Sequence, residues 1–211
     1  MGIFDRLKKK PVAKERTLLP EEIELQRRLK EQDDFIAEKN KAEQAYKDTG
    51  DSDALLAFYR GVFSENKTPV VCGSWMFNYP ELLIKEKKFD EAWGVLNLFR
   101  LLLPDKVGRI SDLQYKILKA ENKHHTDAIF HLMVSYLYRV KGTTDPIGFY
   151  LNGEKERFLK KAKPLAKKAS LNDSDLEAFS SMIEWQIDTS RYSDKKLHEA
   201  YSTYLKNKTE N

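Results

Sequence analysis

The residue types most able to do chemistry gather in one stretch, His124-His125-Thr126-Asp127, with His131 four residues further on. On a helix His124, Asp127 and His131 share one face, and such a face suits a divalent metal ion. The stretch lacks the His-Glu-x-x-His pattern of zinc-protease helices. Its residues also fit capping and packing, because the helix dipole favours an aspartate near a helix start. We therefore predict that no metal binds here. His124, Asp127 and His131 are kept as weak metal candidates, for the alternative that one does.

Templates for other kinds of catalysis are missing from the sequence. It contains no glycine-rich phosphate loop, no Gly-x-Ser-x-Gly elbow and a single cysteine, Cys72. Acidic pairs such as Asp90 and Glu91 stand where helix starts are expected, so we interpret them as dipole partners. The sequence predicts no catalytic residues and no cofactor, and hence not an enzyme. A helical metal-dependent enzyme built on the three metal candidates is the alternative.

A run of basic residues forms the strongest local patch of charge. It comprises Arg157, Lys160, Lys161, Lys163, Lys167 and Lys168. On a helix these residues lie on more than one face, which is typical of a solvated surface. Phe149, Tyr150 and Phe158 are the nearby aromatic residues that could stack on bases. A binding site for an acidic partner or for RNA is the alternative interpretation of the patch.

Net charge argues against nucleic acid as the main partner. The chain has a formal charge of +4, and residues 1–16 alone hold six basic and two acidic groups. Residues 17–211 balance at 31 of each, whereas nucleic-acid-binding domains carry excess positive charge. No apolar run approaches the roughly 20 residues that span a bilayer, and a single cysteine fits a reducing compartment. We therefore expect a cytoplasmic protein.

Composition divides the chain into a leader and a folded part. Residues 1–19 are predicted to form a flexible, basic N-terminal leader. Within it, residues 3–10 place three apolar residues before three lysines, which predicts a weak peripheral membrane contact. Residues 20–208 are predicted to form a single helical-repeat domain, with a weak boundary at 142–153, where Gly, Asp and Pro gather.

Helical periodicity predicts the elements that position these residues. The stretch 80–104 contains two apolar-faced helices with a break near Glu86–Lys88. A capping-box pattern predicts a helix start at Ser111, and Pro164 predicts a kink or break in a helix over 154–170. No useful length alternates at period two, so no sheet is expected. The predicted fold is all-α, with about nine to ten helices stacked as antiparallel pairs.

Small alanines recur at a nearly constant interval of 34 to 38 residues, at Ala54, Ala92, Ala128, Ala162 and Ala200. Such an interval is typical of stacked helix–turn–helix repeats. The best unit is marked by Phe89, Ala92, Leu96, Phe99 and Pro104. It resembles a tetratricopeptide repeat, and the match fades along the chain, so the whole resembles a degenerate array. The resemblance implies a right-handed superhelix whose concave face, lined by the first helix of each pair, holds a peptide or another protein.

The function that the resemblance implies is a protein- or peptide-binding scaffold. Its candidate groove residues are Ser74, Phe77, Glu81, Ile84, Leu113 and Ile117, of which the last two also fit a plain core position. If Phe77 lines the groove, Phe77→Ala weakens partner binding and leaves the melting temperature nearly unchanged. The alternative function is a nucleic-acid-associated regulator that uses the basic helix over 157–168.

Overall fold

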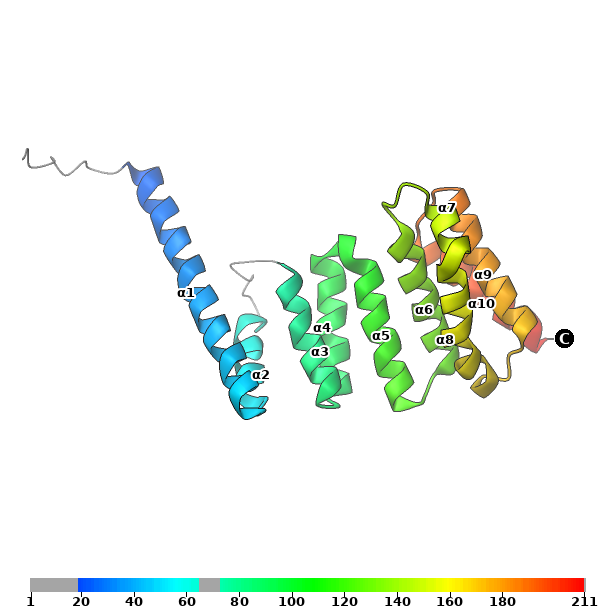
Figure 1. Cartoon of the computed structure of the whole chain (residues 1–211), viewed down its shortest axis with the longest axis horizontal. Helices are drawn as coiled ribbons and strands as arrows, with labels where there is room; N and C mark the ends of the chain where they lie inside the picture. The colour runs from blue at the N-terminus through cyan, green and yellow to red at the C-terminus, as the bar shows by residue number, and fades with distance from the viewer. Residues whose placement is uncertain (1–18, 65–72, 211) are drawn as a thin grey trace, which may run out of the picture. The chain divides into compact units, whose positions relative to one another are not determined.

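A computed structural model describes residues 19–64 and 73–210, and every regular element within them is helical (Figure 1). The prediction of an all-α protein is confirmed for this part of the chain. No helix in the described ranges combines the length and the apolar composition that crossing a bilayer requires. The leader predicted over 1–19 and the membrane contact predicted at 3–10 lie outside the described residues, apart from Leu19.

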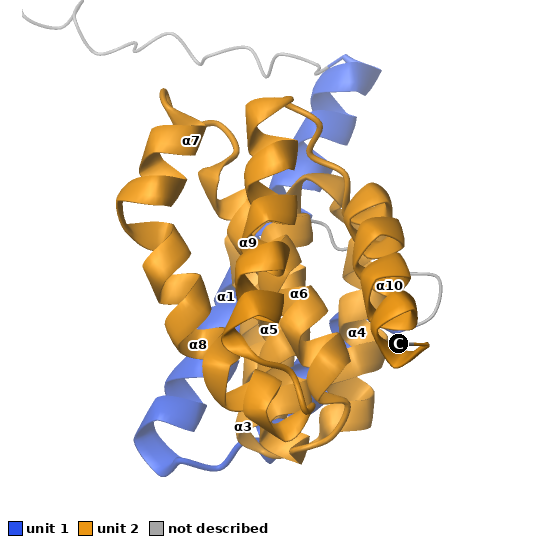
Figure 2. Ribbon diagram, turned by 90° about the vertical axis from the view of Figure 1, so that its right-hand side faces the viewer, with its two compact units in different colours: residues 1–72 blue, residues 73–211 orange. Residues whose placement is uncertain are grey.

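The chain divides into two compact units, residues 1–72 and 73–211 (Figure 2). This division differs from the predicted single domain over 20–208. The segment 142–153, predicted as a weak boundary, belongs to the second unit. Tyr150 anchors it there, because its ring is fully buried and its hydroxyl lies 3.2 Å from the Ser180 hydroxyl.

The described part of the first unit, residues 19–64, is a helix pair, α1 (Pro20–Thr49) and α2 (Asp53–Val62). Gly50 ends α1 in the left-handed conformation, with a φ of 73°. The two helices meet through Phe35 and Phe58, whose ring centroids lie 5.8 Å apart. No residue of α1 is buried, and ion pairs between neighbouring turns stabilise its solvated surface.

The second unit opens with two helix pairs that alternate in direction (Figure 1). Its elements up to residue 140 are η2 (Ser74–Phe77), α3 (Asn78–Lys85), α4 (Phe89–Leu102), η3 (Pro104–Lys106), α5 (Val107–Glu121) and α6 (His125–Val140). The break between α3 and α4 falls at 86–88, as predicted. The helix start predicted at Ser111 is wrong, because α5 begins at Val107 and Ser111 is fully buried inside it.

The rest of the second unit comprises α7 (Pro146–Phe149), the π-helical turn η4 (Tyr150–Glu154), α8 (Lys155–Lys168), α9 (Asp173–Asp188) and α10 (Asp194–Thr209). Helix α8 continues through Pro164, so the predicted break does not occur. An interior proline costs a helix about 3 kcal/mol. Packing offsets that cost, because Phe158, Ala162, Leu165 and Ala166 bury one face of α8.

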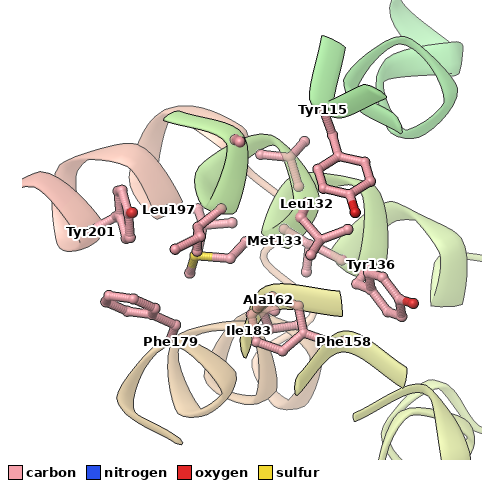
Figure 3. Close-up of a cluster of buried hydrophobic side chains, with 14 of the residues drawn as sticks. Tyr115, Leu132, Met133, Tyr136, Phe158, Ala162, Phe179, Ile183, Leu197 and Tyr201 are labelled. Atoms are coloured by element: carbon pink, nitrogen blue, oxygen red, sulfur yellow. The ribbon is translucent and has the colours of Figure 1, made fainter. Parts of the chain in front are cut away.

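Helix α6 forms the centre of the second unit and packs against α5, α8, α9 and α10. Figure 3 shows side chains from these helices converging around Leu132 and Met133 of α6. Both residues are fully buried, as are Phe158 of α8 and Phe179 of α9. Each helix therefore buries its apolar face against a neighbour, which no single pair could do alone.

A close approach between α5 and α6 depends on Gly108. A Cβ at this position would lie 2.7 Å from the Cβ of Tyr138, a separation that real side chains do not reach. The glycine therefore lets the start of α5 pack directly onto the end of α6.

The recurring alanines occupy unequal environments. Ala92, Ala128 and Ala162 are fully buried, on α4, α6 and α8. Ala54 and Ala200 are exposed. The interval therefore marks close helix packing at the three central positions and not at the two outer ones.

A buried carboxylate ties the start of α9 to the end of α10. Asp175 accepts hydrogen bonds from the Asn172 backbone N–H (2.6 Å) and the Tyr204 hydroxyl (2.8 Å), and it pairs with the Lys208 ammonium. Burial acts to raise the pKa of Asp175, but these donors outweigh it, so the pKa lies below its ordinary value. The charged carboxylate is thus part of the folded structure.

The lowered pKa of Asp175 predicts a pH-dependent contribution to stability. A depressed carboxyl pKa stabilises the fold above the unfolded value of about 4 and loses that effect as the pH falls through the folded value. We expect Asp175→Asn, which keeps an oxygen for the helix cap, to cost most free energy of unfolding at neutral pH. Urea unfolding of both proteins at decreasing pH should show this cost shrinking. A cost that stays constant with pH would contradict the assignment.

Candidate functional site

The candidate groove predicted from the sequence does not form an open surface. Phe77, Leu113 and Ile117 are each only 1% exposed. The Phe77 ring packs edge-on against Phe99, at a centroid distance of 5.5 Å, and the guanidinium of Arg109 covers it. For these three residues the groove prediction is wrong, because their apolar side chains are drawn into the core.

The other three groove candidates lie at or near the surface. Ser74 and Glu81 are exposed and Ile84 is partly buried. Glu81 forms an ion pair with Arg109 at 3.2 Å. Of these three, Ile84 is the one apolar side chain, and it is only partly accessible.

The structure separates the metal candidates. The His124 Nδ1 lies 3.8 Å from the nearest Asp127 carboxylate oxygen, on an exposed turn. His131 instead packs edge-on against Trp93, at 5.5 Å between centroids, and its pKa falls to about 4 because of burial, aided by Arg100 and His198. Across residues 19–64 and 73–210 no group of three or more His, Cys, Asp or Glu side chains is placed to hold a metal ion.

Helix α8 presents its basic residues to two separate hollows. Lys163 and Lys167 line a trough toward the start of α9, where Lys163 pairs with Asp173 at 2.9 Å. Arg157, Lys161 and Lys168 line the other hollow, and Lys160 borders both. The residues of the predicted basic patch therefore lie in two hollows, on different sides of α8.

The second of these, which we call the basic hollow, has a volume of about 490 Å³ and lies among α5, α6 and α8. Its lining residues are Lys119, Tyr136, Arg139, Arg157, Lys160, Lys161, Pro164, Leu165 and Lys168. Of these described residues, six are cationic and none is acidic. The residues of α8 that line the hollow, from Arg157 to Lys168, span about 16 Å of that helix, at 1.5 Å per residue. The hollow is thus an elongated, positively charged groove.

One buried carboxylate orients the two arginines of the basic hollow. Glu154 is 3% exposed and ends the π-helical turn that precedes α8. Arg157 Nη1 donates to its Oε1 at 2.5 Å, and Arg139 Nη1 donates to its Oε2 at 3.2 Å. The two guanidinium groups, which come from different helices, are therefore held side by side at one end of the hollow.

The floor of the basic hollow is the ring of Tyr136. Figure 3 shows this ring beside Phe158, with its hydroxyl directed away from the core cluster. The Arg139 guanidinium carbon lies 4.8 Å from the ring centroid and the Lys161 ammonium 5.5 Å from it, both within range of cation–π attraction. No described group bonds to the Tyr136 hydroxyl, which is buried. Burial also raises the pKa of Tyr136.

Sequence reasoning missed the three lining residues that lie outside α8, which are Lys119, Tyr136 and Arg139. They lie on helices that precede the basic run, and nothing in their local sequence ties them to it. Tyr136 and Arg139 are three residues apart and so share a helix face, which is the one local signal that could have found them.

Because Phe77 is buried, Phe77→Ala is expected to destabilise the protein, rather than to leave its melting temperature nearly unchanged. We now expect Phe77→Ala to lower the free energy of unfolding by about 3–5 kcal/mol, the usual cost of emptying a buried phenylalanine site. Urea unfolding measures the change. Leu101→Ala is the matched control, because Leu101 is 81% exposed and its removal should cost less than about 0.5 kcal/mol. Equal costs for the two variants would contradict the burial of Phe77.

The unbonded hydroxyl of Tyr136 predicts an unusual substitution. Tyr136→Phe should leave the free energy of unfolding unchanged or raise it by up to about 1 kcal/mol, because it removes a buried polar group without a partner. The control is Tyr201→Phe, since the Tyr201 hydroxyl donates to the Thr126 carbonyl at 2.8 Å. That variant should lose about 1 kcal/mol. A similar loss from Tyr136→Phe would show that its hydroxyl has a partner.

Comparisons with protein-family models, with curated proteins and with solved structures found no match for this chain.

Proposed function

We propose that the chain is a non-catalytic binding module, of the tetratricopeptide-like superhelical type, and that it acts in the cytoplasm. Its basic hollow binds an extended acidic segment of a partner protein. The observation that carries the proposal is the hollow itself, which six cationic side chains and no acidic one line, along about 16 Å of α8.

The packing of the second unit supports this proposal. Helix α6 packs against both α5 and α8, so the hollow lies between α5 and α8, with α6 as its floor. A groove formed between neighbouring helices of a stack is the kind of surface on which the resemblance to tetratricopeptide repeats implies that a partner binds.

The electrostatics of the hollow define the partner that it favours. Lys119, Lys160 and Lys161 form no ion pair with any carboxylate in the described part of the chain. Bringing like charges together disfavours the empty groove, and an acidic segment would relieve that repulsion. Charge complementarity of this kind also steers association and rejects basic partners.

A nucleic-acid-associated regulator is the second candidate, because the same cations could bind phosphates of RNA. The arrangement of aromatic residues favours a protein. Single strands are usually held by bases stacked on exposed aromatic rings, whereas Tyr136, the aromatic residue that lines the hollow, is fully buried beneath Arg139 and Lys161.

Site-specific photocrosslinking tests the proposed groove. A photoreactive amino acid at Lys119 or Lys160, on opposite sides of the hollow, should crosslink to acidic segments of the same partner protein in cells that express the chain. The same amino acid at Lys195, on α10, serves as the control. Double reversal to Lys161→Glu and Lys168→Glu should abolish crosslinking from both positions, because it inverts one charge near the arginines and one at the opposite end of the groove.

The possible outcomes separate the two candidates. Crosslinked material that is sensitive to ribonuclease and free of protein would favour the nucleic-acid alternative. Crosslinking that is the same from Lys195 as from the hollow would contradict the proposed groove. Circular dichroism of each variant confirms that it folds.

A further inference from the structure

The two ends of the basic hollow differ in chemistry. At one end, Arg139 and Arg157 are fixed by the shared carboxylate of Glu154. At the other end are two lysines, Lys119 and Lys168, of which Lys168 bonds to the Asn122 side chain. A guanidinium presents several N–H donors in a rigid plane, whereas an ammonium is a mobile point charge. The arginine end is therefore built for a ligand with a defined shape.

Glu154 uses only part of the donor capacity of the two arginines. Each guanidinium has five N–H groups, and each gives one Nη1 hydrogen bond to Glu154. Their side chains remain 39% and 69% exposed for Arg139 and Arg157. Lys160 and Lys161 follow Arg157 by three and four residues, about one helical turn, and line the same hollow. Free donors from four side chains thus surround one end of the groove.

We propose that this arginine end binds a phosphate monoester, carried by a phosphorylated serine or threonine of the partner segment. The inference rests on the proposed function, since the phosphate belongs to the segment that occupies the basic hollow. A phosphate monoester carries a charge of about −1.5 to −2 at neutral pH and three strong acceptor oxygens. A glutamate side chain offers one charge and two oxygens, so it matches two oriented arginines and two lysines less completely.

Glu154 acts as a positioning residue in this site. The negative charge of Glu154 weakens the attraction of the hollow for any anion. If net charge alone decided affinity, Glu154 would therefore only weaken binding. Its benefit is geometric, because it holds two guanidinium groups from different helices in one orientation. Pre-organised donors lose less entropy when the ligand binds.

Three fluorescent peptides of the same short acidic sequence test the proposal. They differ at one central position, which is phosphoserine, glutamate or serine, and their binding to the whole chain is followed by fluorescence anisotropy at fixed salt. We expect the phosphoserine peptide to bind at least about tenfold more tightly than the glutamate peptide, the effect of one additional charge-assisted hydrogen bond. Inorganic phosphate should compete with the phosphoserine peptide.

Two variants test the geometry. Arg157→Lys keeps the charge and removes the planar fork, so it should lower the preference for phosphoserine over glutamate. Glu154→Gln should lower the same preference, although it makes the hollow more positive. A uniform strengthening of all three peptides by Glu154→Gln would overturn the positioning role. Lys195→Gln, on α10 and away from the hollow, should leave the preference unchanged. If Glu154→Gln does not fold, Arg157→Lys, at an exposed side chain, still decides the question.

The remaining outcomes separate this inference from the proposed function. Equal affinity for the phosphoserine and glutamate peptides, both abolished by Lys161→Glu with Lys168→Glu, would overturn the phosphate site and leave the acidic groove intact. Tighter binding of oligouridylate than of the phosphoserine peptide, weakened by the same variants, would overturn the inference in favour of RNA. Failure of all acidic peptides to bind would overturn both the inference and the proposed groove.

Discussion

The burial of most of α6 among its neighbours is the constraint on which the second unit depends. Nine of its residues are buried, and it packs against α5, α8, α9 and α10. Because these four helices share one helix as their core, each is fixed in orientation by the side chains of α6. The fold is therefore best described as helices packed around a common buried member, rather than as a row of independent pairs.

The basic hollow follows from this arrangement. Tyr136 and Arg139 lie one turn apart near the end of α6, so the helix that forms the core also supplies the floor and one wall of the groove. Helix α8 is held beside α6 by Phe158 and Ala162, which are buried. The basic residues of α8 lie outside this buried face. Repulsion among those cations costs stability, and the core that packs beneath them offsets it.

The sequence predicted the helices well and the site only in part, for one physical reason. Helix positions depend on local periodicity, so the break near residue 87 and the helices on either side of it could be predicted directly. Which apolar face becomes core depends on neighbours that are distant in sequence, and Phe77 was assigned to the wrong side for that reason. The basic run was visible, but its division between two hollows, and the roles of Lys119 and Arg139, required the packing of three helices.

Gly108 does not line the basic hollow, but it affects the width of the hollow, because it sets how closely α5 approaches α6. Any larger residue there would push α5 away from α6, and these helices carry Lys119 on one side of the hollow and Arg139 on the other. The spacing between the cations is thus governed partly from outside the groove. A homologue with a bulkier residue at this place would present the same charges at a different separation, and so select a ligand of another size.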